Sequence, residues 1–139
     1  MALIGLIAGA GCSSSAKSDA GTATPAAITN GRSIFQTGKA ASGVQIVAAQ
    51  PPLRTNCAAC HQPDGSGGLQ LPGGVVSADL RYAALVTKQK HPYTPALLER
   101  AISTGIDNEG QALSPVMPRW KLSKQDLHDV AAYVLTQFK

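Results

Sequence analysis

The stretch Cys57-Ala58-Ala59-Cys60-His61 places two thiols and an imidazole within one short run of the chain. Pairs of cysteines at this spacing occur in zinc sites, in thioredoxin-like redox sites and in sites that attach a haem covalently. The spacing alone therefore leaves three kinds of site open: zinc, thioredoxin-like redox and covalent haem. The other residues of the chain distinguish among them.

The remaining ligand types argue against the first two kinds of site. The only other cysteine is Cys12, far upstream, and the only other histidines are His91 and His128, so a closed four-ligand zinc cage is hard to assemble. A thioredoxin-like motif follows a strand in a βαβ unit, and the chain shows no convincing strand alternation. The sequence thus favours haem attachment.

A C-x-x-C-H run suits a c-type haem because two thiols add across the two vinyl groups on one edge of the porphyrin. We predict that Cys57 and Cys60 tether one haem c covalently and that His61 is the first axial ligand of its iron. A ligating histidine normally donates its other ring N–H to a backbone carbonyl. The predicted carbonyl is that of Pro72, in the glycine-rich stretch after the motif.

Met117 is the predicted second axial ligand. Apart from the initiator it is the only methionine, and it lies in a loop with a proline on either side. Prolines stiffen the backbone and hold a thioether at a fixed point, and haem iron accepts His together with Met. His91 is the rival and would give a bis-histidine site. Trp120 is expected to pack on the haem or the core, with its ring N–H near a propionate.

Composition bounds the rest of the molecule. The 139 residues correspond to one domain plus a terminal segment. Aromatic residues make up only 4%, and a buried haem would supply much of the missing apolar surface. The formal net charge is +4, but the Lys and Arg residues are scattered without aromatic interleaving, which argues against a nucleic-acid partner.

The N-terminal part of the chain predicts export. Residues 1–11 are uncharged and apolar or small, too short to span a bilayer, and are interpreted as the hydrophobic part of a signal peptide. The residues ending at Cys12 resemble the lipobox of bacterial lipoproteins, which predicts a lipid anchor there; an ordinary export signal is the alternative. Residues 12–25 predict a flexible tether and residues 26–139 the haem domain. We expect a periplasmic or other extracytoplasmic location.

Helical patterns cover much of the haem domain. The predicted helices are about 26–36 closing near Gly38, Ser77 through Val86 with Ser77 as N-cap, Thr94 to Gly105 with Pro95 in the first helical position, and from Ser123 to the end. Gly31 lies one turn before Phe35, where another helix can approach closely, and Tyr133 is the candidate contact. Residues 38–56 are expected to form a loop with at most a short extended piece, and 62–74 a loop without helix or strand.

Taken together, these features resemble a class I cytochrome c over about residues 26–139. The matching parts are Gly31-x-x-x-Phe35, the Cys57–His61 motif, the glycine-rich run after it, Met117-Pro118, and a last helix with Ala-Ala-Tyr133. The resemblance implies an all-α fold whose first and last helices cross beside the haem. It also implies a one-electron carrier rather than an enzyme, with redox proteins of the cell envelope as partners and no small-molecule substrate.

Two other functions stay open at this point. The chain is alternatively the cytochrome subunit of a larger dehydrogenase or oxidase, or, if the sixth iron position is open, a haem peroxidase or sensor. Arg54, Arg119 and Lys121 are candidates to steer an acidic partner toward the haem edge.

Overall fold

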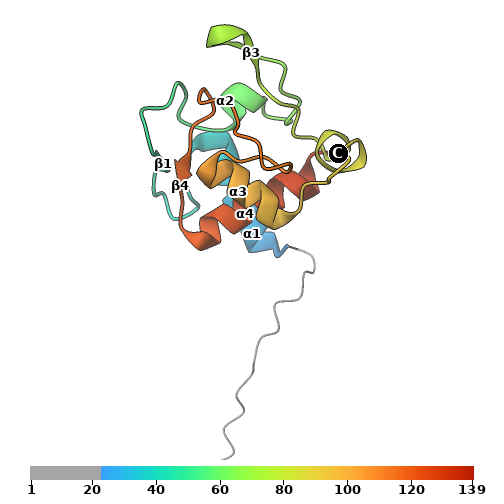
Figure 1. Ribbon diagram of the computed structural model, residues 1–139. Helices are drawn as coiled ribbons and strands as arrows, with labels where there is room; N and C mark the ends of the chain where they lie inside the picture. The colour runs from blue at the N-terminus through green and yellow to red at the C-terminus, as the bar shows by residue number, and fades with distance from the viewer. Residues whose placement is uncertain (1–22) are drawn as a thin grey trace, which may run out of the picture.

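The computed structural model describes residues 23–139, so the predicted signal peptide, Cys12 and most of the predicted tether lie outside the described residues. The elements in chain order are α1 (Pro25–Thr37), β1 (Val47–Ala48), α2 (Ala58–His61), β2 (Gln70–Leu71), the 3₁₀ turn η1 (Pro72–Gly74), β3 (Val75–Val76), the π-helical turn η2 (Ala83–Thr87), α3 (Pro95–Thr104), β4 (Trp120–Lys121) and α4 (Lys124–Gln137). Helices dominate, which confirms the predicted all-α class (Figure 1). Within residues 23–139, no helix combines the length and apolar character needed to cross a membrane.

Helices α1 and α4 pack against each other in the lower part of the molecule as Figure 1 draws it. Helix α1 begins at Pro25, one residue before the predicted start, and ends at Gly38. At the crossing, a Cβ added to Gly31 would lie 2.1 Å from the carbonyl oxygen of Asp129 and 2.7 Å from Cβ of Tyr133. Only glycine lets the two backbones approach this closely, so the predicted contact between Gly31 and Tyr133 is confirmed.

A buried carboxylate lies at the same crossing. Asp129 is only 4% exposed. It accepts hydrogen bonds from the side-chain amides of Asn30 on α1 (2.8 Å) and Gln125 on α4 (2.7 Å). Asn30 also donates to Asp126, at 2.9 Å. These amide donors replace water around the buried carboxylate and join the two helices through polar contacts as well as apolar ones.

An Asp129→Ala substitution is expected to lower the free energy of unfolding by about 1–3 kcal/mol, because the partly buried hydrogen bonds from the amides of Asn30 and Gln125 to this carboxylate are lost. Urea unfolding of the haem-loaded protein measures the change. The control is Glu109→Ala, an exposed carboxylate whose removal costs little. Equal stability of the two variants would show that the buried network contributes nothing net.

The predicted ends of α3 and the predicted start of α4 are confirmed, because their caps are local. Helix α4 ends at Gln137 and does not reach Phe138, which is extended. The hydroxyl of Thr94 caps α3, Pro95 is its first residue, and Gly105 ends it with a left-handed φ of 71°. Ser123 caps α4 by accepting the N–H of Asp126 at 3.1 Å.

The prediction of a helix from Ser77 through Val86 is wrong in its first part. Ser77 is buried, its N–H donates to the carbonyl of Leu69 and its hydroxyl accepts the N–H of Leu69, both at 2.9 Å. The serine therefore closes a hairpin instead of capping a helix. Within the predicted range, helical structure is found only toward its end, at η2.

That hairpin is formed by β2 and β3, which pair antiparallel and project away from the helices at the top of Figure 1. The prediction that residues 62–74 contain no strand or helix is wrong, since β2 and η1 lie within them. Gly73 and Gly74, with φ values of 77° and 73°, allow the tight reversal between the two strands. The short extended piece predicted within residues 38–56 is confirmed as β1, which pairs with β4.

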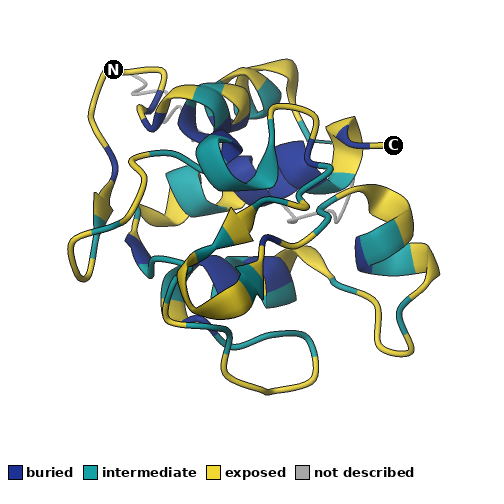
Figure 2. Ribbon diagram, turned by 90° about the horizontal axis from the view of Figure 1, so that it is seen from above, coloured by how far each residue is buried: buried dark blue, intermediate teal, exposed yellow. Residues whose placement is uncertain are grey.

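The core lies where the helices meet, as the buried residues in Figure 2 show. Three of its aromatic rings, those of Phe35, Tyr133 and Phe138, contact one another, with ring centroids 4.9–5.7 Å apart. The carbonyl of Phe138 accepts the N–H of Tyr82 at 2.8 Å. The end of the chain is thereby joined to the segment that follows the cysteine motif.

Candidate haem-binding site

The cysteine motif forms the short helical turn α2. The carbonyl of Cys57 accepts the N–H groups of Cys60 and His61, at 3.1 and 2.9 Å. The side chain of Asn56 accepts the N–H of Ala59 at 2.8 Å and satisfies the start of the turn. The turn thus presents both thiols and the imidazole to one cavity.

The cavity has a volume of about 620 Å³, which is within the range of pockets that hold small molecules and cofactors. Its lining is mostly apolar and comes from segments far apart in the sequence: Phe35, Leu53, Leu71, Val75, Leu80, Leu85, Leu98, Ile102, Val116, Trp120, Val130 and Val134. An apolar chamber of this kind shields a bound group from water and lowers the local dielectric constant.

His61 is held by a backbone carbonyl. Its Nδ1 lies 2.9 Å from the carbonyl oxygen of Ala78. Because a carbonyl only accepts, Nδ1 carries the hydrogen and Nε2 keeps its lone pair. Burial lowers the pKa of His61 by more than the bond to Ala78 raises it, so the ring is neutral at physiological pH. A neutral imidazole is the form that binds a metal.

The prediction that Pro72 supplies this carbonyl is therefore wrong. Pro72 lies in η1 at the exposed tip of the hairpin and does not line the cavity. The hairpin leads the chain away and brings it back, so that Ala78 rather than Pro72 lies beside His61. Gly67 makes room for this contact, since a Cβ there would lie 2.3 Å from the carbonyl oxygen of Ala78.

The two thiols are in environments that favour the protonated form. Burial, and secondarily the charge of Cys60, raise the pKa of Cys57 to about 12. Burial also raises the pKa of Cys60, although Arg54 opposes it. Thioredoxin-like and zinc sites need thiolates, which these surroundings disfavour. Among residues 23–139, no group of three or more Cys, His, Asp or Glu side chains is arranged to hold a metal ion.

Of the two candidates for the second axial ligand, only Met117 lines the cavity. Met117 and Trp120 line it together with the cysteine motif. His91 does not line it: its Nδ1 lies 3.5 Å from a carboxylate oxygen of Glu109, and its side chain is 60% exposed. Trp120 is buried in the core, as predicted, and its contact with a propionate remains a prediction.

Two contributors to the site were not predicted. One is the carbonyl of Ala78, which no side-chain pattern marks. The other is Arg119, whose guanidinium donates to three carbonyls of the loop that carries Met117. Because these contacts occupy its guanidinium, Arg119 is less free to bind a partner than the exposed Arg54 and Lys121.

Two thiols, a neutral imidazole and a thioether in one apolar cavity suit a haem, and together with the crossed helices they define a helical protein built around a covalently attached cofactor. Residues 28–138 match the model of the family described as cytochrome c. The chain belongs to the cytochrome c family: it binds a covalent c-type haem with its iron, carries electrons and has redox proteins as partners. No curated protein sequence matches the chain.

Proposed function

We propose that this protein is a class I cytochrome c that acts as a one-electron carrier in a bacterial cell envelope, with His61 and Met117 as its axial ligands. Cys57 and Cys60 are the attachment residues in this proposal. The observation that carries it is that Met117 lines the same cavity as Cys57, Cys60 and His61, whereas His91 is not among the lining residues.

When bound, the haem supplies reversible exchange of one electron at its iron. Cys57 and Cys60 would hold the haem covalently through thioether bonds to its vinyl groups. The carbonyl of Ala78 holds His61 with Nε2 free for coordination. Met117 offers a soft thioether, which favours Fe(II) over Fe(III) relative to a second imidazole. If His61 and Met117 both bound the iron, they would leave no position for oxygen, peroxide or another small substrate, which supports a carrier rather than an enzyme.

The surface beside the cavity supports a redox partner with an acidic face. Leu53 and Arg54 are exposed and also line the cavity, so they lie at its rim. Lys121 on β4 pairs with the exposed Val47 on β1. From residue 20 to residue 63 the chain contains no Asp or Glu. Asp79, Asp107 and Glu109 also line the cavity, so its surroundings are not basic throughout. We expect an acidic partner to bind on the side of Leu53 and Arg54, where the surface is apolar and basic.

The proposed location rests on the sequence before residue 23. The apolar residues 1–11 support export, and the small residues before Cys12 support a lipid anchor on that cysteine. The following polar stretch, which ends where α1 begins at Pro25, would let the haem domain move near the membrane surface. Intact-mass spectrometry of protein purified from membranes tests the location, because an unmodified Cys12 would remove the proposed anchor.

The absorption spectrum of the haem-loaded protein, oxidised and reduced, tests the proposed function. We expect sharp α and β bands in the reduced protein and, in the oxidised protein, the weak far-red band assigned to iron–methionine charge transfer in cytochromes c. A low-spin spectrum without this band would indicate that His91, and not Met117, is the second axial ligand. A high-spin spectrum that changes on addition of carbon monoxide or peroxide would overturn the carrier in favour of an enzyme or sensor.

A further inference from the structure

One arginine, Arg119, donates three hydrogen bonds to the loop that carries Met117. We propose that Arg119 is a positioning residue for iron coordination: its guanidinium holds the methionine loop, residues 113–118, in the shape that presents the thioether of Met117 to the iron. This inference rests on the proposed function, in which Met117 is an axial ligand.

The hydrogen bonds of Arg119 span the methionine loop. Its Nη1 donates to the carbonyls of Ser114 (3.2 Å) and Met117 (2.5 Å), and its Nη2 donates to the carbonyl of Leu113 (2.8 Å). The loop adds one backbone bond of its own, from the N–H of Met117 to Ser114 at 3.1 Å. Its two prolines have no N–H to donate. The N–H of Val116 also donates to the hydroxyl of Ser114, at 3.3 Å. The planar guanidinium is the group that joins three carbonyls of the loop, and it thereby restrains the curvature of the loop.

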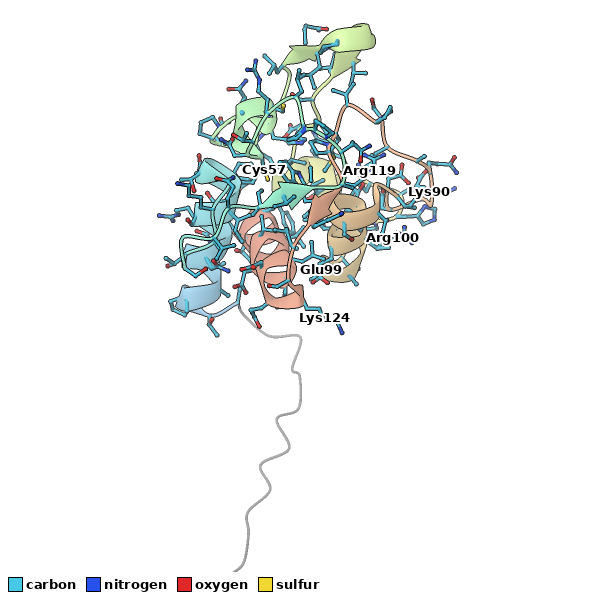
Figure 3. All side chains as sticks on the ribbon, turned by 90° about the vertical axis from the view of Figure 1, so that its left-hand side faces the viewer. Cys57, Lys90, Glu99, Arg100, Arg119 and Lys124 are labelled. Atoms are coloured by element: carbon cyan, nitrogen blue, oxygen red, sulfur yellow. The ribbon has the colours of Figure 1, made fainter. Side chains whose placement is uncertain are left out.

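The guanidinium is itself confined between rigid elements. A Cβ added to Gly105, at the end of α3, would lie 1.9 Å from Nε and 2.0 Å from Cζ of Arg119. Gly105 also accepts the N–H of Leu113 at 2.8 Å, so α3 contacts both the arginine and the loop. The backbone carbonyl of Arg119 accepts the N–H of Ala49 at 2.8 Å, beside β1 and β4. Figure 3 shows Arg119 on the same side of α3 and α4 as Cys57.

This arrangement opposes release of the ligand. A thioether is a neutral ligand, and its departure from iron requires the loop to move. Movement of the loop breaks charge-assisted hydrogen bonds from Arg119, which are stronger than neutral ones. A lysine keeps the charge but cannot span three carbonyls, because its ammonium is a single point without the planar fork. A glutamine loses both the charge and the fork.

Binding of imidazole to the oxidised protein measures how readily Met117 is displaced. We expect Arg119→Gln to bind imidazole on the order of tenfold more tightly than the wild type, and Arg119→Lys to lie between them. The control is Lys124→Gln, which removes the same charge from an exposed position at the start of α4 (Figure 3) and is expected to match the wild type.

A pair of glycine variants tests the same inference without changing Arg119. Gly105→Ala displaces the guanidinium and is expected to tighten imidazole binding. Gly110→Ala imposes similar backbone strain, since φ is 84° at Gly110 and 71° at Gly105, but a Cβ at Gly110 meets no atom within 4 Å. We expect Gly110→Ala to bind imidazole as the wild type does.

The inference is overturned if both Arg119 variants bind imidazole with wild-type affinity, or if the two glycine variants are equally affected. If Arg119→Gln does not fold, Arg119→Lys and the glycine pair decide. Failure of the proposed function gives a different result, because the wild type itself would then lack the far-red band. The positioning role of Arg119 would be overturned together with the proposed function. A wild type that shows the band, together with unaffected variants, overturns the role of Arg119 alone.

Discussion

Replacement of Met117 by alanine is expected to abolish the far-red band of the oxidised protein and to lower its reduction potential by on the order of 0.1 V or more, because axial ligands strongly set the potential of haem iron. The thioether favours Fe(II), and a water or nitrogen donor in its place favours Fe(III). Potentiometric titration followed by absorption measures the change.

The same variant is expected to gain reactivity. Apart from Met117 the described residues contain no methionine, so no second thioether is available to take its place. Carbon monoxide should then bind the reduced Met117→Ala protein, whereas it should not bind the wild type. Carbon monoxide binding therefore distinguishes a haem protein whose sixth iron position is occupied from one in which that position is open.

The matched control for this prediction is His91→Ala. The ring of His91 is largely exposed beside Glu109 and does not line the cavity, so its loss should leave the spectrum and the potential unchanged. A Met117→Ala spectrum identical to that of the wild type would show that Met117 is not the ligand. A changed His91→Ala spectrum would then favour the bis-histidine alternative.

Gly31→Ala is expected to lower the free energy of unfolding by about 3 kcal/mol, the upper end of the usual cost of overpacking, because the new Cβ would meet backbone atoms. That is a large part of the total stability of a small domain, about 5–15 kcal/mol. The new Cβ would meet the backbone carbonyl oxygen of Asp129 at 2.1 Å, and a backbone atom cannot rotate away as a side chain can. Helix α4 must shift, and with it Val130 and Val134, which line the cavity.

The helix propensity of residue 31 and its contact with α4 predict opposite effects of this substitution on stability. In an isolated helix, alanine is favoured over glycine by about 1 kcal/mol. Gly43→Ala is the control, because a Cβ at Gly43 meets no atom within 4 Å and only the positive φ of 87° costs energy. Urea unfolding of both haem-loaded variants measures the difference. A Gly31→Ala protein as stable as the wild type would mean that the helices separate at little cost.

Much of the local structure could be predicted because its causes lie within a few residues. The caps of α3 and α4 depend on a side chain and an N–H three positions apart, as for Ser123 and Asp126. The attachment motif is equally local, since one helical turn carries Cys57, Cys60 and His61. The close approach at Gly31 was also predictable, because a glycine inside an amphipathic helix marks a place where another backbone fits.

Other features depend on segments far apart in the sequence. Ser77 has the form of an N-cap, but its hydroxyl bonds to Leu69 across a hairpin. Asp129 lies beside the exposed His128, yet it is buried because Asn30, 99 residues earlier, meets it at the helix crossing. Such partners leave no periodic signal in the sequence.

By itself the sequence determined the attachment motif, the helical class, both ends of α3 and the start of α4. The motif and these helix ends each depend on side chains within about one helical turn of one another. The tertiary structure alone decided which carbonyl holds His61, that Met117 rather than His91 lines the cavity, and that Arg119 holds the methionine loop. These outcomes depend on how the hairpin, the end of α3 and the methionine loop pack together. Such packing reflects the sum of many weak contacts over the whole chain, and no short stretch encodes it.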